Sequence, residues 1–216
     1  MIKRIQAGSR NEWLKVRESY IGGSDAACIL GANPWKSNVE LWEEKTGLKE
    51  PDDISDKDAV AYGTAAEEHL RELFALDFPQ YFVEHYKNAM YVNSKYPWAH
   101  ASLDGELTDQ KGRKGILEIK TTAISGAAAK AKWEHKIPQN YFIQLLHYML
   151  VTEWDFAVLK AQLKYDIDGD LFLQTRHYTL ERDAVESEIA YLAEKEKEFA
   201  DMIRTKTQPA LLLPEI

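Results

Sequence analysis

Apolar side chains recur at helical spacing in several stretches of the chain. In residues 58–76 they form the stripe of an amphipathic helix, made by Val60, Leu70, Leu73 and Phe74. Ser9 followed three positions later by Glu12 is a capping-box pattern, which marks the start of a helix. Patterns of these kinds predict helices at residues 9–19, 25–31, 58–76, 138–151 and 181–204.

Short apolar runs bounded by turn residues lie between these helices and predict β-strands. We expect strands at residues 81–92, 98–107, 115–122, 155–165 and 171–179, and a polar loop at 49–58. The order is helices, a β meander, a helix, two strands and a helix. It predicts an α/β (α+β) fold with one central mixed β-sheet flanked by helices. The chain is long enough for one full domain, and we assign residues 1–216 to it.

The predicted strands before and after the turn near Lys111 carry an unusual set of polar residues. A hairpin centred on this turn places Asp104 opposite Glu118 and Ser102 opposite Lys120. Side chains alternate between the faces of a strand, so Glu118 and Lys120 share one face. We therefore expect four polar groups to converge there. The buried face would hold Leu103, Leu117 and Ile119.

Two neighbouring carboxylates on a partly buried surface repel each other and need a cation. A hard, oxygen-ligated ion such as Mg²⁺ fits this requirement. A lysine at the same place can position an attacking water or neutralise developing charge, so the set suits phosphodiester hydrolysis. The alternative is an exposed hairpin with cross-strand Glu–Lys pairs, which are common stabilisers of sheets.

Asp104, followed after a spacer by Glu118-Ile119-Lys120, resembles the signature of the PD-(D/E)XK nuclease superfamily. Leu103 stands where the proline of that name would be. The resemblance implies a restriction-endonuclease-like core.

A second motif runs from Gly63 to Glu67 and resembles the G-x-x-x-E motif of the lambda-exonuclease/YqaJ-type viral recombinase family. Helical periodicity places Glu67 on the apolar stripe of residues 58–76. The neighbouring Glu68 falls on the side of Thr64 and Arg71. A carboxylate on an apolar stripe needs a partner, so we select Glu67 for the site.

Two further motifs resemble the same family. Gln144 and Tyr148 form a Q-x-x-x-Y pattern and sit on one face of the helix at 138–151. His147 lies beside them, and we do not expect it to bind a metal. Near the N-terminus, a W-x-x-x-R pattern precedes a Gly-Gly-Ser segment in which the serine opens a helix; the key residues are Trp13, Arg17 and Ser24.

The resemblance implies a single YqaJ/lambda-exonuclease-like nuclease domain that uses Mg²⁺, for which Mn²⁺ substitutes. The ion would be held by Asp104, Glu118 and the Ile119 carbonyl, with Glu67 completing the site or bridging to a second ion. Lys120 would position the nucleophilic water. The DNA and its 5′-phosphate would be held by Trp13, Arg17, Ser24, Ser102, Gln144 and Tyr148.

By the same resemblance, we expect 5′→3′ digestion of double-stranded DNA ends that leaves a 3′ single strand for phage-type recombination. A ring-shaped trimer and a single-strand annealing protein as partner are also implied. The alternatives are a PD-(D/E)XK endonuclease of restriction or repair type, a catalytically silent DNA-binding protein of the same fold, and an acidic scaffold protein with a chance motif.

Composition narrows these possibilities. The net charge of −8 argues against a surface that coats nucleic acid broadly, although an acidic chain can still contain a basic channel. The single cysteine, Cys28, excludes an internal disulfide and cysteine-based zinc or iron–sulfur sites, and we expect it to be buried. We expect Trp35 and Trp42 to be core residues. No membrane-spanning run and no apolar N-terminal signal segment are visible, so we expect a cytoplasmic protein without membrane association.

Overall fold

The structure is a computed structural model and describes residues 1–54 and 56–213. Its helices are α1 (Arg10–Glu18), α2 (Gly23–Ile29), α3 (Asn38–Lys45), α4 (Asp58–Asp77), α5 (Ala127–Ala131), α6 (Gln139–Thr152) and α7 (Glu186–Thr205), with a 3₁₀ turn at Arg182–Ala184. Its strands are β1 (Ile2–Gln6), β2 (Phe82–Glu84), β3 (Ala89–Asn93), β4 (Tyr96–Ala101), β5 (Gly105–Thr108), β6 (Lys114–Ile124), β7 (Phe156–Ile167) and β8 (Asp170–Glu181).

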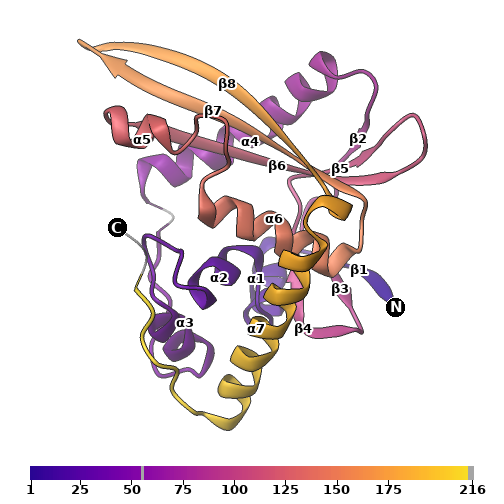
Figure 1. Ribbon diagram of the computed structural model, residues 1–216, viewed down its shortest axis with the longest axis vertical. Coiled ribbons are helices and arrows are strands. Elements are labelled where there is room, and N and C mark those ends of the chain that lie inside the picture. Colours follow the sequence, from indigo (N-terminus) through magenta and orange to yellow (C-terminus); the bar gives the residue numbers. More distant parts are fainter. Residues whose placement is uncertain (55, 214–216) are drawn as a thin grey trace.

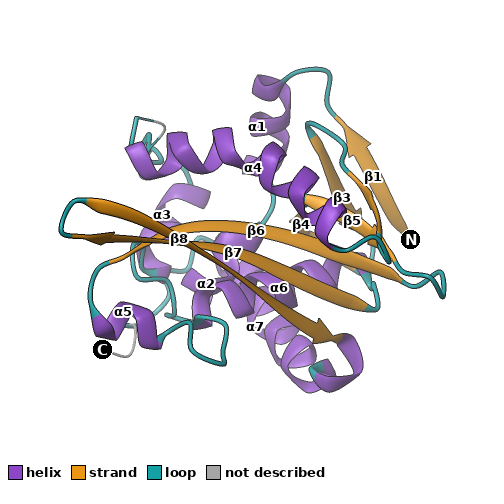
Figure 2. Ribbon diagram, turned by 90° about the horizontal axis from the view of Figure 1, so that it is seen from above, coloured by secondary structure: helices purple, strands orange, loops and turns teal. Residues whose placement is uncertain are grey.

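The central sheet is mixed, as the sequence predicts. Among the described residues its strand order is β2-β5-β6-β7-β8, with β6 and β7 parallel and the other pairs antiparallel. Helix α4 covers one face of this sheet, and α6 lies on the other face with α2 and α7 behind it (Figure 2). Apolar side chains fill both layers: Leu70 and Phe74 of α4 pack on Leu117 and Ile119, whereas the buried face of α6 packs in a separate cluster.

A second sheet, in the order β1-β3-β4, departs from the expectation of one sheet (Figure 1). The predicted strand at 98–107 is two strands, because the chain bends at Ser102–Asp104 and passes from β4 in one sheet to β5 in the other. The predicted strand at 81–92 is likewise divided into β2 and β3. A period-two pattern continues across such bends, so it does not reveal them.

The hairpin register predicted from the turn near Lys111 is confirmed. Gly105 pairs with Leu117 and Thr108 pairs with Lys114, which is the alignment that places Asp104 opposite Glu118. The ladder itself stops at Gly105, so Asp104 lies just beyond its end. Because Asp104 lies beyond the ladder, its side chain does not have to point to one of the two sheet faces, as the side chains of a regular strand do.

Several side chains lie elsewhere than the apolar pattern suggested. Leu73 is 45% exposed, because it lies at the edge of the α4 stripe, and Trp35 is 73% exposed in the loop before α3. Leu103 packs in the α6 cluster rather than with Leu117, because the bend turns it to the other side of the sheet. Cys28 and Trp42 are buried, as expected.

Candidate active site

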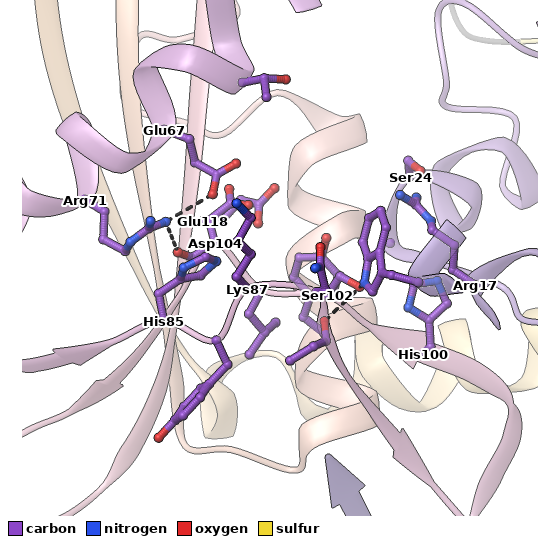
Figure 3. Close-up of a pocket in the computed structure, with 18 of the residues that line it drawn as sticks. Arg17, Ser24, Glu67, Arg71, His85, Lys87, His100, Ser102, Asp104 and Glu118 are labelled. Carbon is purple, nitrogen blue, oxygen red and sulfur yellow. Dashed lines mark hydrogen bonds and ion pairs between the residues drawn. The ribbon is translucent and has the colours of Figure 1, made fainter. Parts of the chain in front are cut away.

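An open cavity of about 930 Å³ lies where α4, α6, the first turn of α2 and the bend between β4 and β5 meet (Figure 3). Every side chain selected from the sequence for catalysis or DNA binding lines it. These are Trp13, Arg17, Ser24, Glu67, Ser102, Asp104, Glu118, Lys120, Gln144 and Tyr148. Residues more than 130 positions apart in the chain are thus gathered in one place.

Asp104 reaches the centre of the cavity from the end of the β5–β6 ladder. Its Oδ2 accepts a hydrogen bond of 2.8 Å from the backbone N–H of Ile119. In an antiparallel ladder a hydrogen-bonded residue turns its N–H and C=O to the same neighbour. The carbonyl of Ile119 therefore faces the same edge, where β5 has already ended, and lies on the side of the Asp104 carboxylate.

Glu118 is buried on β6 and is contacted by two donors at one of its oxygens. Lys120 Nζ lies 2.6 Å from Glu118 Oε1, and Gln144 Nε2 donates to the same oxygen at 2.7 Å. Gln144 also donates to the Tyr148 hydroxyl at 2.8 Å. The other oxygen, Oε2, is buried and has no hydrogen-bond partner among the described residues. This oxygen is therefore free to accept a cation or a hydrogen-bond donor.

The charges of these groups are mutually dependent. Burial raises the pKa of Asp104 well above its usual range, and the negative charge of Glu118 adds to the effect. Burial also raises the pKa of Glu118, although Lys120 opposes it. The pKa of Lys120 is raised, because the two carboxylates outweigh the effect of burial, so it stays protonated. Lys120 is thus a fixed cation and not a proton acceptor at neutral pH.

Glu67 joins this group from α4, and the choice of Glu67 over Glu68 agrees with its position. Glu67 is partly buried and points toward Asp104 and Glu118, whereas Glu68 is exposed (Figure 3). Helical spacing groups Arg71 with Glu68, but the guanidinium turns to Glu67. Arg71 Nη1 lies 3.0 Å from Glu67 Oε1 and 2.7 Å from the backbone carbonyl of Asp104.

The opposite end of the cavity carries cationic and hydroxyl side chains. The Arg17 guanidinium lies 4.6 Å from the centre of the Trp13 ring, with which it forms a cation–π contact. Ser24 lies in the first turn of α2, which begins two residues earlier than predicted, at Gly23. Ser102 Oγ is buried and lacks a hydrogen-bond partner within the described ranges.

Gly23 connects two of the motifs. A Cβ at this position would lie 2.6 Å from a ring carbon of Tyr148 and 2.9 Å from Cγ of Gln144. The glycine therefore allows the start of α2 to approach the Q-x-x-x-Y face of α6. This close approach explains why a Gly-Gly-Ser segment and a Q-x-x-x-Y helix occur together in the sequence.

The donors at the centre of the cavity fit a hard divalent cation. No group of three or more His, Cys, Asp or Glu side chains in residues 1–54 and 56–213 forms a ready metal site. However, Asp104, the unpartnered Oε2 of Glu118 and the Ile119 carbonyl are oxygen donors of the type that Mg²⁺ prefers. His147 is satisfied elsewhere, by Glu196 at 2.6 Å and the His100 carbonyl at 2.8 Å, so it is not available to a metal.

Residues 12–155 match the family described as YqaJ-like viral recombinase domain. The chain belongs to this family. This YqaJ-like domain is 34% identical over 189 residues to the uncharacterised protein YqaJ of Bacillus subtilis (strain 168). The alignment covers 87% of the chain but 55% of that relative, so the chain spans about half the length of the curated protein it matches.

Solved structures share its fold. An alkaline exonuclease, LHK-Exo from Laribacter hongkongensis, superposes with a TM-score of 0.57 at 21% identity, covering 93% of this chain and 100% of that one. A phage-related exonuclease from Haemophilus somnus 129PT gives 0.55 at 14% identity, covering 87% and 96%. These matches confirm the predicted α/β fold with a central mixed sheet flanked by helices. In the part of the YqaJ-like domain that the structure describes, no helix is both long and apolar enough to span a membrane.

Some lining residues of the YqaJ-like domain were missed in the sequence. Arg71 lies four positions after Glu67 and could have been found from that spacing. Arg10 precedes Trp13 and Arg17 at helical spacing and is similarly accessible to pattern analysis. The others are His85, Tyr86, Lys87, Asn88 and His100. Most of these lie in a loop that was hidden inside the predicted strand at 81–92, so nothing in the sequence pattern pointed to them.

Proposed function

We propose that this chain is a Mg²⁺-dependent deoxyribonuclease that digests double-stranded DNA from its ends. The observation that carries the proposal is the pair of Asp104, which is partly buried, and Glu118, which is buried, beside Lys120; one oxygen of Glu118 has no partner in the described part of the chain. Family membership and a fold shared with an alkaline exonuclease and a phage-related exonuclease support it.

In this proposal Mg²⁺, or Mn²⁺ in its place, is held by Asp104, Glu118 and the carbonyl of Ile119, and Glu67 completes the site or bridges to a second ion. The bound ion would stabilise negative charge on the phosphate and make a water molecule more acidic. Lys120, which contacts Glu118, is placed to orient the attacking water. Gln144 keeps Glu118 in place by donating to its Oε1, and the Tyr148 hydroxyl holds Gln144 by accepting from the same amide group.

Arg17, Ser24 and Ser102 form the DNA-binding end of the cavity, and Trp13 holds Arg17 in place. An arginine can bind phosphate oxygens in a bidentate manner, and the free hydroxyls can donate to the same group. We propose that this end receives the 5′-phosphate, with Gln144 and Tyr148 between it and the carboxylates.

The direction and the assembly follow from family analogy and are part of the proposal. We propose 5′→3′ digestion that leaves a 3′ single strand for phage-type recombination. We also propose a homo-oligomer, as a trimeric ring, that acts with a single-strand annealing protein in the cytoplasm of the cell.

The test is digestion of a linear duplex labelled at one 5′ end or one 3′ end, with Mg²⁺ and then with excess chelator. We expect release of the 5′ label first, and no release with chelator. Asp104→Ala and Lys120→Ala should each reduce the rate at least 100-fold, in the range found when one electrostatic group is removed from a catalytic site. Lys114→Ala is the matched control, because Lys114 lies on the same strand, outside the cavity, and donates to Thr108 Oγ1.

Undiminished digestion by Asp104→Ala or Lys120→Ala would overturn the assignment of the site. Cutting of closed circular DNA would instead identify an endonuclease. DNA binding without digestion by the native chain would identify a catalytically silent protein of the same fold.

A further inference from the structure

Arg71 is placed to fix the shape of the site without taking part in it. It extends from α4, its side chain is 12% exposed, and its guanidinium lies between Glu67 and the bend at Asp104 (Figure 3). One nitrogen, Nη1, contacts Glu67 Oε1 at 3.0 Å and the backbone carbonyl of Asp104 at 2.7 Å. Arg71 thus joins the carboxylate of one element to the backbone of another.

The contact with the Asp104 carbonyl occurs where the β5–β6 ladder has ended. A backbone carbonyl at such a place loses its partner on the neighbouring strand, and a buried unpaired carbonyl is costly. Arg71 supplies the donor, while the N–H of Ile119 holds the carboxylate of the same residue. Asp104 is therefore held at its backbone and at its side chain by two different elements.

The stem of Arg71 passes beside Gly105. A Cβ at Gly105 would lie 3.5 Å from Cδ of Arg71, an ordinary van der Waals distance, and 3.2 Å from the side chain of Leu117. The guanidinium of Arg71 then reaches the carbonyl one residue earlier, at Asp104.

We propose that Arg71 is a positioning residue that sets the geometry of Asp104 and Glu67 for a divalent cation. The inference rests on the proposed function, because it assumes that this pair of carboxylates binds an ion. Arg71 contacts neither the ion nor the DNA in this account. A simple helix-surface pair at i and i+4 contributes little to stability and would leave metal affinity unchanged, so the two roles are separable.

Arg71→Lys is the decisive variant, because it keeps the charge near the site but its shorter side chain does not extend to the position of Nη1, the atom that contacts both acceptors. Arg182→Lys is its matched control. Arg182 pairs with Glu186, also four residues away, at 2.9 Å, and donates to the backbone carbonyl of Met149 at 2.6 Å, outside the cavity. Mn²⁺ binding to the full chain without DNA is measured by calorimetry, together with kcat, the KM for duplex DNA and the thermal midpoint.

We expect Arg71→Lys to weaken Mn²⁺ binding roughly tenfold, the loss of about one charge-assisted hydrogen bond, and to lower kcat with little change in KM. Arg182→Lys should leave Mn²⁺ binding, kcat and KM unchanged. Glu67→Gln keeps an oxygen that accepts from Arg71. Adding Arg71→Lys to Glu67→Gln should still weaken Mn²⁺ binding, because the contact with the Asp104 carbonyl is lost as well.

Native Mn²⁺ affinity in Arg71→Lys would overturn the role of Arg71 and leave the proposed function intact. The role of Arg71 would also be overturned if the double variant Glu67→Gln/Arg71→Lys bound Mn²⁺ as tightly as Glu67→Gln alone. The contact of Arg71 with the Asp104 carbonyl would then have no effect on Mn²⁺ affinity. A native chain that binds no Mn²⁺ and digests no DNA would overturn the proposed function, and the role of Arg71 with it. If Arg71→Lys does not fold, Arg71→Gln, which can still donate to one acceptor, takes its place with the same expected weakening.

Discussion

Asp104 is held in place by groups that do not neutralise it. The N–H of Ile119 and the guanidinium of Arg71 fix its carboxylate and its backbone, while Glu118 lies beside it with the same charge. Lys120 is shared between the two acids and contacts Glu118 directly. At the scale of single residues, the site therefore brings like charges together, and the proposed cation would relieve their repulsion.

Removal of one of these charges should stabilise the metal-free protein. The raised pKa of Asp104 means that the folded state releases its proton at a higher pH than the unfolded state. The contribution of Asp104 to stability therefore falls as the pH rises from about 4, the usual value, through the raised pKa. Asp104→Asn keeps an oxygen that accepts from the N–H of Ile119, and it removes the decrease in stability that ionisation of Asp104 causes.

We expect Asp104→Asn to raise the free energy of unfolding in chelator at pH 8 by on the order of 1 kcal/mol, or about 2–4 °C in Tm. The gain should shrink toward pH 4, and Mg²⁺ should raise the Tm of the native chain but not of the variant. Thermal unfolding with and without Mg²⁺ measures this. Equal Mg²⁺ stabilisation of both proteins would show that the ion binds elsewhere.

At the scale of elements, the site depends on the close approach of α2 to α6. Gly23 has no side chain because the ring of Tyr148 occupies the space. Tyr148 in turn contacts Gln144, which holds Glu118. Displacement of α6 by a methyl group at Gly23 would therefore be transmitted to a carboxylate of the proposed metal site.

Gly23→Ala should lower the free energy of unfolding by about 1–3 kcal/mol, the usual cost of overpacking, and should also reduce nuclease activity. The exposed Ser24→Ala, one position along the same helix, should change stability by less than about 0.5 kcal/mol. Chemical denaturation of the two variants makes the comparison. If Gly23→Ala had the same free energy of unfolding as the native chain, α2 and α6 could move apart to fit a methyl group without loss of stability.

The elements also show what a sequence can and cannot predict. The turn near Lys111 determines the β5–β6 register, and helical periodicity separates Glu67 from Glu68, because both depend on local geometry. The bend at Ser102–Asp104 was not predicted, because it depends on a second sheet, β1-β3-β4, in which the N-terminal strand β1 takes part. The loop that carries His85 and Lys87 was missed for the same reason.

At the scale of the whole molecule, the net charge of −8 is compatible with DNA binding only if the contacts are local. Among the cationic side chains that line the cavity, Arg17 lies at the end away from the carboxylates, whereas Arg71 and Lys120 lie beside them (Figure 3). The molecule is therefore expected to hold one end of a duplex through a few phosphates and not to coat its length. The assignment of residues 1–216 to one domain stays a prediction.

Arg17→Ala should weaken binding to a 5′-phosphorylated duplex and reduce the dependence of log K on log salt by about one unit. Preference for a phosphorylated over an unphosphorylated end should fall, with Mn²⁺ affinity unchanged. Arg204→Ala, on α7 beside Asp201 and outside the cavity, is the control. An unchanged salt slope in Arg17→Ala would place the phosphate contacts elsewhere.

The most direct test of the proposed metal nuclease is a crystal structure of the native chain grown with Mn²⁺, with its anomalous scattering recorded. We expect an anomalous peak in contact with Asp104, Glu118 and the carbonyl of Ile119, and no peak at that position in Asp104→Asn. A native chain that digests DNA but shows no manganese at this position, or shows it only at other residues, would contradict the proposed metal site.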